Sequence, residues 1–204
     1  VIMVPTVWGF MTFIAPQYEQ GYNASLLDKV ERLKNLPGER IVLIGNSNVS
    51  FGFQSDLIEQ AYGMPVVNMG LHGGLGNAFH EKMATINVHK GDIYVICHHT
   101  FADEGKIDDI ELAWITLENH YELYPLADRK DYPLLALGFP TYMKKAGVLW
   151  GMGLLNKEAA KNYNAKTDAC YSRDAFNEYG DVAYERKDGN FVFKEQELPQ
   201  INEE

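Results

Sequence analysis

The stretch IVLIGNSN, residues 41–48, decides the fold that we expect for this chain. Its first four residues form a continuous apolar run, which is typical of a strand buried on both faces of a sheet. Two further short runs, PVVN at 65–68 and IYVIC at 93–97, have the same character. Helical patterns lie between these runs. Short strands that alternate with helices predict an α/β fold with a parallel sheet and right-handed crossovers.

Apolar residues at helical spacing predict a helix before the first strand and one after each of the first two strands. The first helix carries the apolar stripe Leu26, Leu27, Val30 and Leu33. We expect its charged residues, Lys29 among them, on the opposite face in solvent. The other two helices are expected at 55–62 and 77–88.

The alternation of strands and helices stops after residue 100. Residues 110–120 and the long apolar stretch 132–162 are expected to be helical elements that pack on the sheet or form a cap. A β-hairpin is expected at 182–194 around the turn Asp188-Gly189, because Asp-Gly between two such runs is a strong turn signal. Tyr121, Tyr124, Tyr132 and Trp150 either belong to a core or line a carbohydrate groove.

Composition indicates a folded globular chain and excludes some partners. The 204 residues are 46% apolar and carry 18 basic against 28 acidic residues, a net charge of −10. Such an acidic balance argues against nucleic acid as the main partner. The cysteines, Cys97 and Cys170, form no CxxC pair, which argues against a disulfide framework or a zinc ribbon. No cofactor motif is found, and we expect no cofactor.

The first 18 residues carry no charge and are largely apolar. One interpretation is a core strand or a buried helix. The other, which we expect, is that residues 1–18 are the remnant of a membrane anchor or signal-anchor, with the rest of the chain outside the cytoplasm at the cell surface. Trp8 and Tyr18 would suit the interface of a membrane, although the stretch alone is shorter than the ~20 residues of a bilayer crossing.

A serine directly follows the first predicted strand. Ser47 would therefore lie at the carboxyl edge of the sheet, where α/β proteins place their sites. Its hydroxyl is a candidate nucleophile, and its backbone N–H could stabilise an oxyanion. The alternative is an ordinary Ser/Asn turn that caps the next helix. The loop NMGLHG, residues 68–73, follows the second strand and should lie at the same edge.

Together the two loops resemble those of the SGNH (GDSL-like) hydrolase family. The first family block, Gly-x-Ser, matches Gly45-Asn46-Ser47, and the second, an Asn followed five residues later by a Gly, matches Asn68 and Gly73. The resemblance covers residues 39–100. It implies a flavodoxin-like, doubly wound parallel sheet, Ser47 as nucleophile and the Gly73 amide in the oxyanion hole. With the apolar N-terminus, the chain looks most like the membrane-anchored branch that modifies cell-surface polymers.

The chain departs from the family at its last two blocks. The third block, an Asn after the third strand, falls at CHHT, residues 97–100, where no Asn occurs. The fourth, Asp-x-x-His, is absent, since none of the six histidines follows an Asp by three residues. We expect the chain to be a fragment whose C-terminal part would supply the base. Alternatively His72, His98 or His99 acts as base, and His99 is our candidate for a substitute donor or base.

A metal site is the other use of these histidines. His72, His98 and His99 would lie at one sheet edge, but no carboxylate or thiolate accompanies them at metal-ligand spacing. We therefore expect no metal.

The resemblance also defines the expected organisation and function. Residues 19–204 would form one SGNH-like domain with its core at 39–100 and a helical and hairpin insertion at about 105–195. The expected function is that of a serine esterase or acyltransferase acting on acyl or acetyl esters of a cell-surface polymer. Its partners would be the acyl-ester or glycan substrate and the membrane. The alternative is a catalytically inactive surface or scaffold protein with the same fold.

Overall fold

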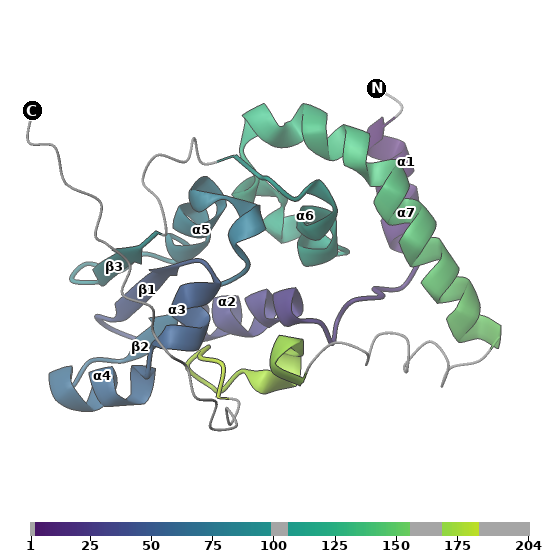
Figure 1. Ribbon diagram of the computed structural model, residues 1–204. Coiled ribbons are helices and arrows are strands. Elements are labelled where there is room, and N and C mark those ends of the chain that lie inside the picture. Colours follow the sequence, from purple (N-terminus) through teal and green to yellow (C-terminus); the bar gives the residue numbers. More distant parts are fainter. Residues whose placement is uncertain (1–2, 99–105, 156–168, 184–204) are drawn as a thin grey trace, which may run out of the picture.

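The computed structural model describes residues 3–98, 106–155 and 169–183. Figure 1 shows how the elements are arranged. The helices and strands follow in the order α1 (Met3–Phe13), α2 (Ser25–Asn35), β1 (Ile41–Gly45), α3 (Ser47–Gly52), α4 (Ser55–Tyr62), β2 (Val66–Asn68), α5 (Asn77–Ala84), β3 (Ile93–Cys97), α6 (Ile110–Leu117) and α7 (Tyr132–Leu155). The 3₁₀ helices are η1 (Tyr22–Ala24), η2 (Gly73–Leu75), η3 (Tyr121–Leu126), η4 (Arg129–Asp131), η5 (Ala169–Tyr171) and η6 (Arg173–Ala175).

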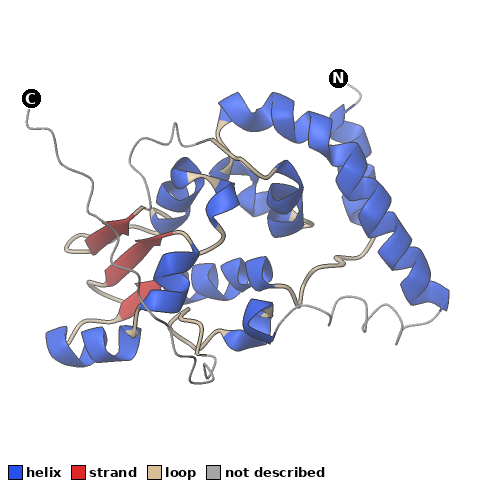
Figure 2. Cartoon of the chain, viewed as in Figure 1, coloured by secondary structure: helices blue, strands red, loops and turns tan. Residues whose placement is uncertain are grey.

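The three strands form one parallel sheet in the order β2-β1-β3 (Figure 2). Leu43 pairs with Asn68 of β2 on one side and with Val95 of β3 on the other. The predicted parallel arrangement is therefore confirmed, as is the packing of α5 against β1. The described chain is a mixed α/β fold built on a small three-stranded sheet.

Helices pack on both faces of this sheet. The side chains of a strand alternate between the two faces, so each face presents apolar groups to the helices. Val42 and Ile44 of β1 join the larger core, which also contains apolar residues of α2 and α5. Ile41 and Leu43 join a smaller cluster with Val49 of α3. The apolar run of β1 is thus buried on both faces, as the sequence predicts.

Aromatic side chains join α1, α6 and α7 on the side of the larger core. Trp114 of α6 packs against Phe139 of α7 with ring centroids 4.9 Å apart, and Phe10 of α1 meets the same ring at 5.9 Å. The described part of the long apolar stretch forms a single helix, α7, that continues through Pro140. Among the helices of the described residues, none combines the length and the apolar character that crossing a membrane requires.

Helix ends and one helix face differ from the prediction. The helix expected at 77–88 ends at Ala84, and the turn that follows it includes Asn87, whose φ is 57°. The helix expected at 110–120 ends at Leu117. Lys29 was expected in solvent but is buried, with 2% of its surface exposed. The reason is that position 29 is three residues after Leu26 and so lies on the buried side of α2.

Part of the predicted hairpin lies outside the described residues. Val182 forms an isolated antiparallel bridge with Phe176, rather than the start of a strand. The remainder of the hairpin, from residue 184 on, and residues 156–162 of the stretch expected to be helical are not among the residues that the structure describes.

Candidate functional site

Ser47 begins α3 directly beyond the carboxyl end of β1. The preceding residue, Asn46, is the N-cap, and its side-chain oxygen accepts a hydrogen bond from the Asn48 amide over 3.1 Å. The close approach of β3 requires a glycine at position 45, since a Cβ there would lie 2.5 Å from the carbonyl oxygen of Cys97. Ser47 is half-buried. The turn expected at 46–48 is therefore the start of a short helix.

The loop after β2 runs alongside β1 toward the same edge of the sheet. The Met69 amide donates to the Leu43 carbonyl over 2.9 Å, and the Leu71 amide donates to the Gly45 carbonyl over 3.3 Å. A Cβ on Gly73 would lie 3.4 Å from the Cβ of Asn46. The second loop therefore lies directly against the residue that precedes Ser47.

The backbone amides of Ser47 and Gly73 share one property. Ser47 is the first residue of α3 and Gly73 the first of η2. The first N–H groups of a helix have no acceptor within that helix. Two such donors in adjoining loops are what an oxyanion hole requires, provided that they point into the same space.

The Asn68 side chain links the loop after β2 to α3 through hydrogen bonds. Its side chain is fully buried. The amide nitrogen donates to the Val49 carbonyl in α3 over 3.0 Å, and the amide oxygen accepts from the Gly70 amide over 2.9 Å. Asn68 therefore acts as a positioning residue that holds the Gly73 loop against the Ser47 helix.

The histidines differ in their surroundings. His72 is exposed, and its Nδ1 accepts from the Gly74 amide over 3.1 Å as the N-cap of η2. His98 directly follows β3, with a side chain only 3% exposed, and its Nε2 lies 3.0 Å from a carboxylate oxygen of Glu81 in α5. Because Cys97 pairs with Gly45, His98 and Ser47 extend from neighbouring strand ends. His99 lies outside the described residues.

A buried carboxylate that the sequence patterns did not identify holds part of this site in place. Asp181, 4% exposed, accepts from the Asn68 side chain over 2.7 Å. It also accepts from the Ser55 hydroxyl over 2.6 Å and from the Ser55 amide over 2.8 Å. Asp181 is far from both partners in the sequence, so no spacing pattern could have found it.

Lys29 is the second missed residue. Its ammonium group donates to the carbonyl oxygens of Asn68 and Gly180 over 2.8 and 2.6 Å, and it lies 4.6 Å from the ring centroid of Phe176. Burial lowers the pKa of Lys29 to about 7, although the negative charge of Asp181 opposes this shift. The signal in the sequence is its helical spacing from Leu26, which identifies position 29 as buried.

Comparisons of the chain with protein-family models, with curated proteins and with solved structures found no match. What we propose for the site therefore rests on its geometry and on the resemblance in the sequence. In the part of the chain that the structure describes, no three Asp, Glu, His or Cys side chains gather in a way that could hold a metal ion.

Proposed function

We propose that this chain is an SGNH-like serine esterase or acyltransferase with Ser47 as its nucleophile. The observation that supports the proposal most directly is the contact between the Gly73 loop and Asn46, the neighbour of Ser47. Two loops that are 26 residues apart in the sequence, counted from Ser47 to Gly73, adjoin at the carboxyl ends of β1 and β2. The strand order β2-β1-β3 is also the order in which flavodoxin-like sheets begin.

The proposed reaction uses these groups in sequence. The Ser47 hydroxyl oxygen attacks the carbonyl carbon of an ester and loses its proton to a base. The carbonyl oxygen takes up the electron pair and becomes an oxyanion, which the amides of Ser47 and Gly73 stabilise. The intermediate then expels the alcohol, which receives the proton. The acyl group on Ser47 is finally transferred to water or to an acceptor hydroxyl.

His98 is the base that the described residues support best. It extends from the strand end next to that of Ser47. The Glu81 carboxylate at 3.0 Å would orient the imidazole and stabilise the positive charge that the ring acquires. His99 stays the candidate from the sequence.

The substrate class and location rest on the sequence resemblance. We propose acyl or acetyl esters of a cell-surface polymer as substrates. The lack of charge in residues 1–18 supports a membrane anchor that displays the domain outside the cytoplasm. Phe10 in this stretch packs against Phe139 of α7, so the anchor would lie directly against the domain. Fractionation of the protein from its native cell tests this part, because recovery in the soluble cytosol would overturn it.

A fluorophosphonate probe tests the nucleophile, because it modifies activated serines covalently. We expect the probe to label Ser47, as mapped by mass spectrometry of the purified chain. Ser47→Ala should abolish labelling. Ser172→Ala is the matched control, since Ser172 is also half-buried but lies outside the site. His98→Gln should slow labelling by about 10²–10⁴-fold if His98 is the base.

Two results would contradict the proposal. Labelling that Ser47→Ala leaves unchanged would make Ser47 a turn residue only. A folded chain in which no serine reacts, checked by circular dichroism, would favour the inactive scaffold protein instead.

A further inference from the structure

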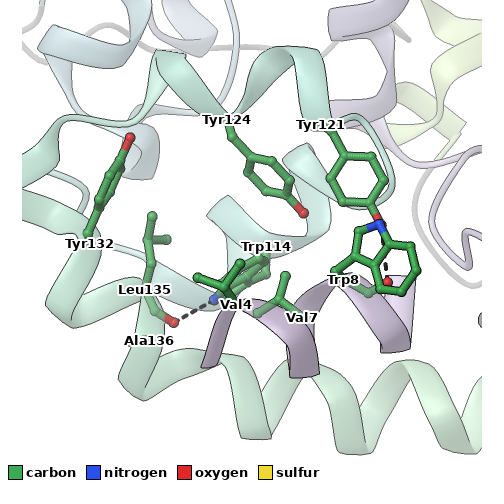
Figure 3. A pocket seen from close by; sticks show the side chains of 9 residues that line it. All are labelled: Val4, Val7, Trp8, Trp114, Tyr121, Tyr124, Tyr132, Leu135 and Ala136. Atoms are coloured by element: carbon green, nitrogen blue, oxygen red, sulfur yellow. Dashed lines mark hydrogen bonds between the residues drawn. The ribbon is translucent and has the colours of Figure 1, made fainter. Parts of the chain in front are cut away.

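An apolar cavity of about 370 Å³ lies between α1, α6, η3 and α7 (Figure 3). Trp8 of α1, Trp114 of α6 and Tyr121 and Tyr124 of η3 contribute aromatic walls, and Ala136 of α7 contributes a small one. Ser47 and Gly73 do not line the cavity, so an inference about it is independent of the proposed esterase site. Among the described residues that line it, none is charged.

Three polar groups of the aromatic walls are already engaged with the backbone. The Trp114 indole N–H donates to the Leu135 carbonyl over 2.8 Å, and the Tyr124 hydroxyl donates to the Glu118 carbonyl over 2.8 Å. The Tyr121 hydroxyl donates to the Trp8 carbonyl over 3.4 Å. The cavity therefore presents ring faces and aliphatic carbon, with few groups left to bind a polar ligand.

This lining excludes most occupants on chemical grounds. A buried sugar would leave hydroxyl groups without partners, and each unpaired hydroxyl costs binding free energy. An α-helix with its side chains is about 10–12 Å wide and does not fit a space of this size. At about 30 Å³ for each water-sized group, the cavity holds a chain of roughly ten to twelve such groups. A narrow, unbranched apolar chain satisfies all three conditions.

We propose that this cavity binds the saturated hydrocarbon chain of a single-chain amphiphile, with the polar head group outside. The side chains at the rim suit such a molecule. Trp8 is 59% exposed and Val4 is 75% exposed, so the mouth is open and apolar. An indole at such a rim contacts the chain with its ring and water with its N–H.

Alkyl maltosides with chains of six, eight and ten carbons test the proposal by calorimetry below their critical micelle concentrations. We expect the dissociation constant to fall by about fourfold for each added methylene group, because each buried methylene contributes a similar transfer free energy. Maltose alone should show no binding. A dissociation constant independent of chain length, or binding of maltose itself, would overturn the proposal.

Tryptophan fluorescence locates the chain within the protein. The sequence holds three tryptophans, of which Trp8 and Trp114 line the cavity and Trp150 does not. A fatty acid brominated at its terminal carbon should quench the fluorescence of the wild-type protein and of Trp150→Phe to a similar extent. The double variant Trp8→Phe, Trp114→Phe should lose most of the quenching. Quenching that persists in the double variant would place the chain elsewhere.

A variant that fills the cavity completes the test. Ala136→Phe should weaken decyl maltoside binding at least tenfold, whereas Ala61→Phe, at an exposed position of α4, should bind like the wild type. Val7→Phe gives a second filling variant if Ala136→Phe fails to fold. Unchanged binding by a folded filling variant would refute the proposal. A wild-type dimer that the filling variant dissociates, together with no alkyl binding, would also refute the proposal, because a second copy of the chain would then occupy the cavity.

Discussion

The side-chain amide of Asn68 donates a hydrogen bond to the carboxylate of Asp181, 113 residues later in the chain, over 2.7 Å. The same carboxylate holds the first residue of α4, Ser55, through two hydrogen bonds. One buried charge thus connects the end of β2, the start of α4 and the segment 169–183. Asp181, near the end of the described residues, therefore helps to position the loop that contains Gly73.

Removal of this carboxylate should destabilise the fold. Asp181→Ala leaves one N–H of the Asn68 side chain, together with the hydroxyl and amide of Ser55, without its acceptor, and we expect a loss of about 3 kcal/mol in the free energy of unfolding. Urea denaturation measures it. Glu178→Ala, an exposed acid in the same segment, should change stability by less than about 0.5 kcal/mol. A similarly small effect of Asp181→Ala would show that the network contributes little.

Glu118 should make the fold less stable as pH rises toward neutrality. Burial raises the pKa of Glu118 to about 7, although hydrogen bonds from the Gln17 and Tyr18 amides oppose this. The unfolded chain loses this proton near pH 4.5, so the folded state binds more protons between that pH and about 7. The free energy of unfolding should therefore fall across this window, by an amount on the order of 3 kcal/mol.

Glu118→Gln provides the comparison for this window, since it cannot titrate and keeps an acceptor for the backbone amides. Its stability should vary less with pH between 4.5 and 7 than that of the wild type, as measured by urea denaturation at each pH. Parallel pH profiles for the two proteins would exclude Glu118 as the source.

Lys29 should make the fold more stable as the pH rises above 7. Burial lowers its pKa to about 7, whereas in the unfolded chain the amine stays protonated until about pH 10.5. The unfolded state therefore binds more protons above pH 7, and the free energy of unfolding should rise with pH. Lys29→Met should lack the rise between pH 7 and about 9, and Lys34→Met, exposed on the same helix, should keep it. Retention of the rise in Lys29→Met would contradict the assignment.

Substitution by alanine should lower the stability of the fold at Gly45 and raise it at Gly151. At Gly45 the added Cβ meets the Cys97 carbonyl at 2.5 Å, so Gly45→Ala should cost about 2 kcal/mol or more. At Gly151, within α7, the Cβ meets no atom within 4 Å, and alanine should stabilise the helix by about 0.5–1 kcal/mol. Thermal unfolding distinguishes the two. A melting temperature that rises for Gly45→Ala would show that the turn has room for a side chain.

Much of the sheet and its helices could be predicted, because the relevant signals are local. The apolar run 41–44 indicates burial on both faces, and β1 is buried on both. The same reasoning predicts a buried strand at 93–97, yet Ile93 and Ile96 of β3 remain 48% and 49% exposed. An apolar run reports the tendency of a strand to be buried, whereas the neighbours that bury it are a property of the whole fold.

The candidate site was predictable in outline only. Parallel strands bring their carboxyl ends to one edge, which is why the loops of Ser47 and Gly73 could be expected to adjoin. The pairing of His98 with Glu81 could not be expected, since it depends on how α5 packs beside β3.

The sequence by itself determined the parallel α/β arrangement and the edge at which Ser47 and Gly73 adjoin. Only the tertiary structure decided the burial of Asp181 and the cavity beside Trp114. The physical reason is the range of the interactions. Periodicity and turn preferences act over a few residues and leave a pattern along the chain. Hydrogen bonds and cavities between residues more than a hundred positions apart leave none, because they form only when the packed elements bring those residues together.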